Sequence, residues 1–288
     1  MGSNRCSQMS SNKVELLAIG NELLIGQVHD SNLFWLSRRL TDIGAVVWQG
    51  YVVRDDMEAI GEVVRLALSH HPKLIITSGG LGPTWDDITV AALGKALGRN
   101  VRLDPRALEM VRQRYEEVKK AGFVPDATLT PERKKMAYLP EGAIPLHNPV
   151  GTAPGVLITE GETNIVALPG VPPEMRGIFE TSLQPYLKEW FSGKGTVQWG
   201  VIIGRGESTI AKIVNEVAEA HPEVYVKSRA RIVDGKAKVL VTLTVSGMER
   251  EEALKKLDAA RKDLMDRLRS VDVPILEEGE HLPFQQET

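Results

Sequence analysis

The stretch LIITSGGLGPTWDDITVAALGKA, residues 74–96, decides the fold class of this chain. It joins a short apolar run, typical of a buried parallel strand, to a helical pattern through a glycine-rich loop. In open α/β sheets such loops lie beyond the carboxyl ends of the strands, where ligands bind. The stretch therefore predicts an α/β fold with a ligand loop over residues 77–87.

The loop combines three glycines with two adjacent carboxylates. Gly79, Gly80 and Gly82 let the backbone turn sharply, and N–H groups that lead into a helix favour an anion. Asp86 and Asp87 would repel a phosphate unless a divalent cation lay between them, and Mg²⁺ binds carboxylates together with phosphate oxygens. The loop thus predicts a metal-bridged phosphate site. The competing interpretation is a tight turn in which an aspartate caps the next helix.

Strand and helix patterns alternate through the first part of the chain. A strand pattern is followed by a helical one three times between residues 14 and 98, which predicts a mostly parallel sheet with helices on both faces. Ser31 is the expected N-cap of the first helix and Gly44 its stop. Further on we expect a charged helix, two strands that could pair as a hairpin, and a closing helix bent at Pro185.

The length of 288 residues favours two domains. FSGKG, residues 191–195, is the expected linker. It separates a nucleotide- or phosphate-binding domain over 13–192 from a small α+β domain over 196–276, with a leader over 1–12 and a tail over 277–288. In the small domain we expect a hairpin turn at Asp234-Gly235. Its last helix should place four leucines on one side: Leu254, Leu257, Leu264 and Leu268.

Composition excludes several classes of protein. The net charge of -3 and the pI of about 6.1 give no strongly basic field, so nucleic acid is not the default partner, although a local basic patch remains open. A single cysteine, Cys6, rules out a disulfide framework and a cysteine zinc cluster. No apolar run approaches the roughly 18–20 residues of a membrane span, and the leader has no signal-peptide pattern. We therefore expect a cytoplasmic protein that does not enter a membrane.

Three further loops should lie at the same edge of the sheet as the glycine-rich loop. GNELLIGQVHDSN follows the first strand, NPVGTAPG is a shaped loop before a later strand, and LPGVPPEM joins the last strand to its helix. Their polar side chains could contact a ligand, or could cap helices and complement a helix dipole. The candidates are Glu22, Asp30 and Asn32 in the first, Asn148, Gly151 and Thr152 in the second, and Glu174 in the third.

These four motifs, in this order and spacing over about residues 14–190, resemble the N-terminal region of the CinA-type family. That family lies within the molybdenum-cofactor-biosynthesis, or molybdopterin-binding, domain superfamily. GRGESTIAKIVNEV and VYVKSRA resemble its KH-like α+β domain. The resemblance implies a three-layer α/β sandwich with a mostly parallel sheet, followed by the KH-like domain. No region resembles the C-terminal amidohydrolase domain of full-length CinA, so its deamidation of nicotinamide mononucleotide is not expected.

The resemblance also implies an activity. We expect a metal-dependent pyrophosphatase of ADP-ribose type; the alternative is a module that binds or transfers a pterin phosphate in molybdenum-cofactor biosynthesis. Asp86 and Asp87 would hold Mg, Mn or Co and orient water. The other implied substrate contacts are Ser78 with Gly79, Gly80 and Gly82 at the pyrophosphate, Asp30 and Asn32 in a D-x-N pattern, Gly151 and Thr152 at a second phosphate or ribose, and Glu22, Asn148 and Glu174. Relatives of this type imply a homo-oligomer.

Two features leave other roles open. Trp85 could stack on adenine or pterin, or pack under its loop, and we expect packing. RNA binding by the small domain needs a GXXG loop, but Gly204 and Gly206 are separated by one residue, so RNA is not the favoured partner. Lys227, Arg229 and Arg231 alternate along one strand, and we expect a solvated strand face. The small domain could instead form a dimer interface.

Overall fold

The computed structural model describes residues 12–233 and 236–280. These residues form two compact units. The first unit comprises the chain up to Leu40 together with Ala45–Ser192, and the second comprises Thr41–Gly44 with the chain from Gly193 onward. Within the described residues, none of the helices has the length and apolar character that crossing a membrane requires.

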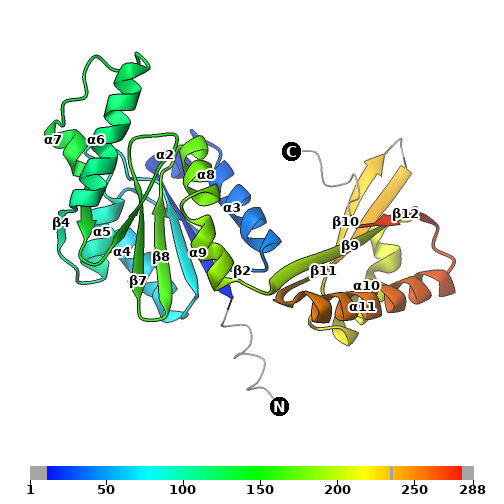
Figure 1. Cartoon of the computed structure of the whole chain (residues 1–288). Helices are drawn as coiled ribbons and strands as arrows, with labels where there is room; N and C mark the ends of the chain where they lie inside the picture. Colours follow the sequence, from blue (N-terminus) through cyan, green and yellow to red (C-terminus); the bar gives the residue numbers. More distant parts are fainter. Residues whose placement is uncertain (1–11, 234–235, 281–288) are drawn as a thin grey trace. The chain divides into compact units, whose positions relative to one another are not determined.

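The first unit is built on a six-stranded sheet (Figure 1). In order across the sheet, the strands are β2 (Val46–Val53), β1 (Lys13–Ile19), β3 (Leu74–Ser78), β8 (Thr163–Leu168), β7 (Gly155–Glu160) and β6 (Ile144–Leu146). The first four run parallel, whereas β7 is antiparallel to both β8 and β6. The carboxyl ends of β1, β2, β3, β6 and β8 and the amino end of β7 therefore lie at one edge, which we call the loop edge.

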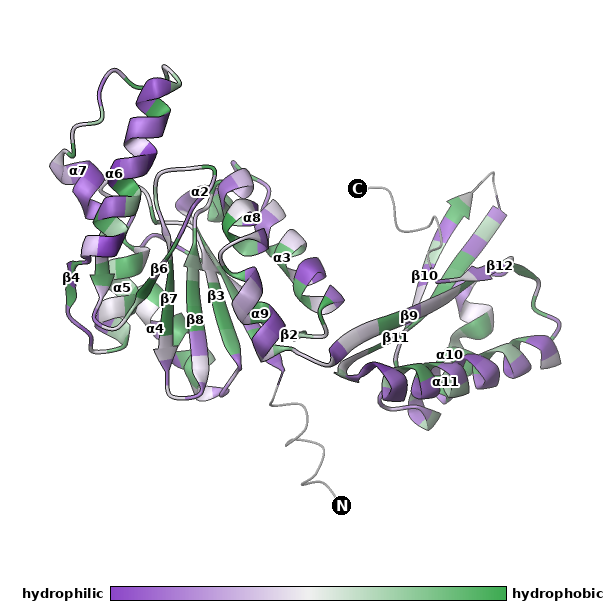
Figure 2. Ribbon diagram, in the orientation of Figure 1, coloured by the Kyte–Doolittle hydropathy of each residue, from purple (hydrophilic) through white to green (hydrophobic). Residues whose placement is uncertain are grey.

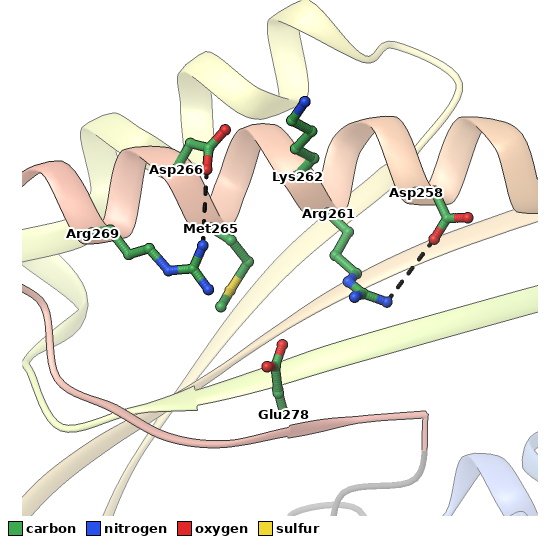
Figure 3. A pocket seen from close by; sticks show the side chains of 7 residues that line it. All are labelled: Asp258, Arg261, Lys262, Met265, Asp266, Arg269 and Glu278. Atoms are coloured by element: carbon green, nitrogen blue, oxygen red, sulfur yellow. Dashed lines mark ion pairs between the residues drawn. The ribbon is translucent and has the colours of Figure 1, made fainter.

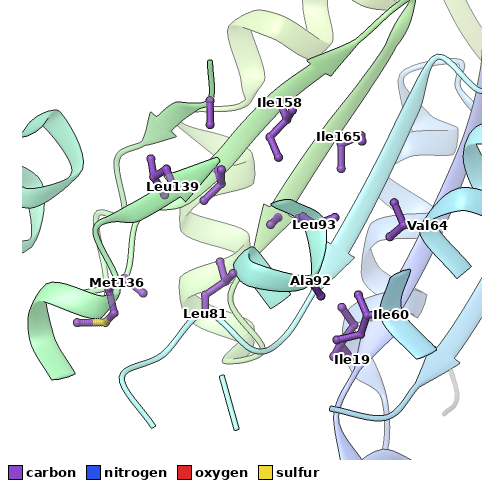
Figure 4. Close-up of a cluster of buried hydrophobic side chains, with 14 of the residues drawn as sticks. Ile19, Ile60, Val64, Leu81, Ala92, Leu93, Met136, Leu139, Ile158 and Ile165 are labelled. Atoms are coloured by element: carbon purple, nitrogen blue, oxygen red, sulfur yellow. The ribbon is translucent and has the colours of Figure 1, made fainter. Parts of the chain in front are cut away.

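Helices cover both faces of this sheet. On one face α4 (Met57–Ser69), α5 (Thr89–Ala96) and α6 (Pro105–Lys120) bury a continuous apolar cluster against the strands (Figure 4). The other face carries α3 (Ser31–Asp42), α8 (Pro172–Glu180) and α9 (Gln184–Trp190), and the rings of Trp35 and Phe179 meet edge to face at 5.1 Å. Figure 2 shows the apolar strands between helices whose outer faces are hydrophilic. The predicted three-layer α/β sandwich is confirmed.

Several local features differ from the prediction. Asp30, not Ser31, caps α3, because its Oδ1 accepts the N–H groups of Asn32 and Leu33 at 2.9 and 3.0 Å. The closing helix is divided into α8 and α9, and Pro185 lies in the first turn of α9, where it loses no helical hydrogen bond. The sequence did not reveal five small elements: α2 (Asn21–Leu24), α7 (Pro131–Lys135), the edge strand β6, and the paired strands β4 (Val101–Leu103) and β5 (Tyr138–Pro140).

The second unit is an antiparallel sheet with the strand order β10, β11, β9, β12. Its elements are β9 (Lys194–Ile203), α10 (Glu207–Ala220), β10 (Tyr225–Val233), β11 (Lys236–Glu249), α11 (Arg250–Ser270) and β12 (Ile275–Gly279). Alternate residues of β9 and β11 pack against α10 and α11, which gives the unit its own core. Leu257, Leu264 and Leu268 are buried as expected, but Leu254 is 38% exposed. The expected turn at Asp234-Gly235 lies outside the described residues.

Candidate functional site

Three loops of the loop edge are tied together by Asn32. Its Nδ2 donates to Ser78 Oγ at 2.9 Å and to the carbonyl of Gly170 at 2.7 Å. The Ser78 hydroxyl in turn donates to the carbonyl of Pro169 at 3.1 Å. Asn32 lies near the start of α3, Ser78 ends β3, and Gly170 follows β8, so residues distant in sequence meet at one point. The Asn32 Oδ1 is buried and has no hydrogen-bond partner.

The glycine-rich loop turns in a way that requires glycine at two positions. Gly79 has φ 120° and Gly80 has φ 68°. A Cβ on Gly79 would lie 2.0 Å from the carbonyl oxygen of Ile19, and a Cβ on Gly80 would lie 2.3 Å from the hydroxyl of Thr89. That hydroxyl donates to the Gly79 carbonyl at 2.8 Å, and Thr89 is fully buried. These glycines thus bring the loop into direct contact with the end of β1.

The two aspartates of this loop are held by Thr84. Its hydroxyl lies within hydrogen-bond distance of both the Asp86 and Asp87 carboxylates, and its N–H donates to Asp87 Oδ2 at 2.8 Å. Gly82 has no side chain, which leaves room for the Asp87 carboxylate beside it. Asp87 therefore acts as a clamp inside its own loop, as the competing interpretation of a tight turn expects. The second half of that interpretation is wrong, because no aspartate caps α5, which begins at Thr89 without a side-chain cap.

The donor set for a metal is consequently smaller than expected. Asp87 Oδ2 is occupied by Thr84, and the described residues contain no group of three or more His, Cys, Asp or Glu side chains arranged to hold an ion. A third carboxylate, Asp55, follows β2 and is close enough to Glu22 and Asp86 for their charges to affect its titration. Partial burial, then these two charges, raise the pKa of Asp55, while the N–H of Asn21 opposes the shift. Metal binding at Asp86 and Asp87 stays a prediction.

Trp85 does not pack under the loop. Its side chain is 89% exposed, so the expectation of packing was wrong. Trp85 lies between Thr84 and Asp86 on a turn that the hydrogen bond between these two residues helps to fix, and its indole is left in solvent. Lys135 on α7 approaches the same turn and donates to the Thr84 carbonyl. The hydroxyl of Thr84, with a smaller effect of Lys135, lowers the pKa of Asp86 below its ordinary value.

The loop before β7 is shaped by a buried asparagine. Asn148 Oδ1 accepts the N–H groups of Val150 and Gly151 at 3.0 and 2.8 Å, and its Nδ2 donates to the Ala153 carbonyl and to Glu174 Oε2, both at 2.8 Å. The Glu174 carboxylate packs against the bare Cα of Gly151. The structure thus places Asn148 and Glu174 in contact and gives both a role in shaping the loop. Their contact with a ligand stays a prediction.

The remaining predicted residues lie around this frame. Glu22 is exposed in α2, and Asp30 caps α3 through one carboxylate oxygen. The hydroxyl of Thr152 is half-buried and lies 3.9 Å from Met136 Sδ. Arg114 was missed by the sequence analysis. Its guanidinium, 16% exposed, donates to the carbonyls of Gly151 and Val150 at 2.9 and 2.6 Å.

A hollow lies away from the loop edge, between α11 and β12 of the second unit (Figure 3). It has a volume of about 550 Å³ and is lined by charged side chains of both signs. Two guanidiniums on α11 pair with aspartates on the same helix, Arg261 with Asp258 and Arg269 with Asp266, at 4.0 Å each. All four side chains are about half exposed or more, so water screens them. We assign the functional site to the loop edge, where buried polar groups converge.

Comparisons with known proteins show the family to which the first unit belongs. A family described as "Probable molybdopterin binding domain" matches residues 15–189. A protein of Aeropyrum pernix is 42% identical over 253 residues, which cover 86% of this chain and 91% of that protein. A protein of Pyrobaculum aerophilum is 44% identical over 244 residues, which cover 83% and 87%. The crystal structure of the protein CinA, of unknown function, from Thermoplasma acidophilum is 39% identical with a TM-score of 0.55, and the match covers 61% of this chain and 98% of that one.

Proposed function

Since the chain belongs to the family of probable molybdopterin binding domains, we propose that its loop edge binds a pterin phosphate. In this proposal the protein is a binding or transfer module of molybdenum-cofactor biosynthesis. The family match spans residues 15–189, nearly all of the first unit. The alternative in the sequence analysis therefore fits better than ADP-ribose hydrolysis, for which neither the fold nor the relatives offer support.

The observation that carries the proposal is the junction of Asn32, Ser78 and Gly170. It joins the loops after β1, β3 and β8, so a ligand at this point would contact several loops at once. The buried, unpaired Asn32 Oδ1 is an acceptor of the kind that a ring N–H could satisfy. A pterin presents such donors next to an apolar ring surface.

The helices that begin at the loop edge suit the phosphate. The Asp30 and Asp56 side chains cap α3 and α4, but α5 begins without a side-chain cap. The start of α8 also has no side-chain cap, but the two prolines in its first turn have no N–H to offer. Uncapped N–H groups at a helix N-terminus favour an anion. Lys135 and Arg114 add positive charge beside the loops that lead to α5 and to β7. In this arrangement backbone groups would hold the phosphate, while the first loop would orient the ring.

If a divalent metal accompanies the ligand, Asp86 is the residue of the glycine-rich loop that would hold it. Both carboxylates contact the Thr84 hydroxyl, but Asp87 Oδ2 also accepts the Thr84 N–H. A metal so placed would offset the repulsion between the phosphate and the carboxylates of Glu22, Asp55 and Asp86. The chain's own contribution would be to fix the Asp86 carboxylate through the Thr84 hydroxyl.

A titration with a fluorescent pterin monophosphate tests the proposal. Thr152→Ala removes a hydroxyl of the loop before β7, which in this proposal contacts the phosphate beside the backbone groups. We expect affinity to fall about 10- to 100-fold, as for loss of a hydrogen bond to a charged group. Thr181→Ala is the matched control, because Thr181 follows α8 and its hydroxyl donates to the carbonyl of Gly177 within that helix. Absence of binding by the native protein, with or without magnesium, would contradict the proposal. Release of AMP from ADP-ribose would instead favour the hydrolase.

A further inference from the structure

The outward side of β10 in the second unit presents a row of one aromatic and three basic side chains. Tyr225, Lys227, Arg229 and Arg231 alternate along this edge strand, and all four are exposed, Tyr225 to 64%. The residues between them face the helices: Val226 packs against the core of the unit, and the Ser228 hydroxyl donates to Glu207 of α10. The row therefore points away from α10 and α11, which cover the opposite side of the sheet (Figure 1).

A fourth cation extends this row onto the neighbouring strand. Lys238 on β11 pairs in register with Arg231, on the same side of the sheet. Residues 225–244 contain five Lys or Arg and a single acidic residue, Asp234, in a protein whose net charge is -3. In the described part of the chain, no ion pair joins Lys227, Arg229 or Lys238 to a carboxylate. Positive charge thus gathers at Lys227, Arg229 and Lys238 on this side of the sheet, although the net charge of the whole chain is negative.

We propose that the β10 row binds single-stranded nucleic acid. Cations two residues apart on a strand are separated by about 6.8 Å, so they can follow an extended phosphate backbone. Tyr225, at one end of the row, offers an exposed ring on which a base can stack. That ring distinguishes nucleic acid from an acidic peptide, for which cations alone would suffice. The proposed surface does not use a GXXG loop, which this sequence lacks. The proposal also does not depend on the function of the loop edge.

The opposing explanation is that charges on an exposed edge strand prevent association between sheets. That explanation requires charge but no aromatic ring, and it predicts no affinity for an oligonucleotide. The two explanations therefore differ in measurable binding and in the role of Tyr225.

The test is fluorescence anisotropy of a labelled, short single-stranded oligouridylate with the full chain. Neutralisation of one phosphate each by Lys227, Arg229 and Lys238 predicts a slope of about -2 for log K against log salt. Affinity should therefore fall about twentyfold between 50 and 200 mM salt. Arg229→Gln should reduce the slope by about 0.7. Tyr225→Ala should weaken binding at least about fivefold at every salt concentration and leave the slope unchanged.

Lys212→Gln is the matched control, because Lys212 lies on α10 and its side chain is 88% exposed. We expect it to bind like the native protein, and circular dichroism should show that every variant is folded. Absence of binding at low salt would overturn the proposal. Equal weakening by Lys212→Gln and Arg229→Gln would do the same, because it would indicate a general charge effect. Native affinity in Tyr225→Ala would also overturn it, since stacking is what selects nucleic acid.

Discussion

The side-chain amide of Asn32, on the first turn of α3, donates to the hydroxyl of Ser78, at the end of β3, over 2.9 Å. The two residues are separated by 46 positions in the sequence, and both are buried. The same amide reaches Gly170 after β8. This contact is the link that turns separate loops into one candidate site.

Asn32→Ala should therefore lower stability as well as binding. It leaves Ser78 Oγ and the Gly170 carbonyl without their amide donor, and we expect a loss of about 1–3 kcal/mol in the free energy of unfolding. Urea denaturation measures this loss. Asn100→Ala is the control, because Asn100 donates to Glu141 at an exposed site. Equal stability of the two variants would mean that the junction contributes nothing.

Gly79→Ala should be among the most damaging glycine substitutions in the first unit. The added Cβ would lie 2.0 Å from the Ile19 carbonyl at a φ of 120°, so the loop must move. We expect a loss of at least about 3 kcal/mol. Gly98→Ala separates the effect of the positive φ from the effect of the steric clash, because Gly98 has a φ of 64° but open space around it. We expect Gly98→Ala to cost about 1–2 kcal/mol. Thermal unfolding that ranks them in the reverse order would refute this account of the turn.

Thr84→Val tests how the glycine-rich loop holds its carboxylates. The Thr84 hydroxyl is the main cause of the lowered pKa of Asp86, so the substitution should raise that pKa toward its ordinary value. A lowered pKa stabilises the folded state above the ordinary pKa, and that contribution is lost as pH falls through the lowered value. Carboxyl NMR titration reports the change. Thr181→Val, which removes a hydroxyl that donates to the Gly177 carbonyl in α8, should leave Asp86 unaffected.

Tyr51 gives a prediction at high pH. Partial burial, then the hydrogen bond and the charge of Glu15, raise the pKa of Tyr51 to about 12. The unfolded chain loses this proton near pH 10, so stability should fall as pH rises from about 10 to about 12. Tyr51→Phe should remove this part of the decline. Tyr138→Phe, at an exposed tyrosine, is the control, and an unchanged decline in Tyr51→Phe would contradict the assignment.

The sheet and the position of the loops followed from local patterns. Buried parallel strands are short apolar runs, and their carboxyl ends must share an edge. The loops that begin at Gly20 and Ser78 could therefore be assigned to the same edge of the sheet from the sequence alone. The linker FSGKG and the hairpin signal at Asp234-Gly235 set the second unit apart, because they predict two consecutive strands with no helix between them.

Hydrogen-bond partners could not be predicted in the same way. Asp30 and Ser31 are both good helix caps, and only the backbone angle decides between them. From the sequence, Asp87 could be a metal ligand or could hold its own turn. Its contact with Thr84, three residues earlier, is visible in the structure alone. Arg114 reaches Gly151 across 37 residues on a charged helix with no local signal. Trp85 is an apolar side chain left exposed, against the rule on which the packing prediction relied.

Hydrogen exchange measured with and without a pterin monophosphate tests the central claim most directly. Bound ligand should slow exchange in the loops after β1, β3 and β8 and before β7, while the helices of the second unit stay unchanged. Protection confined to the hollow between α11 and β12, or no protection at ligand concentrations that saturate binding, would contradict the assignment of the loop edge as the functional site.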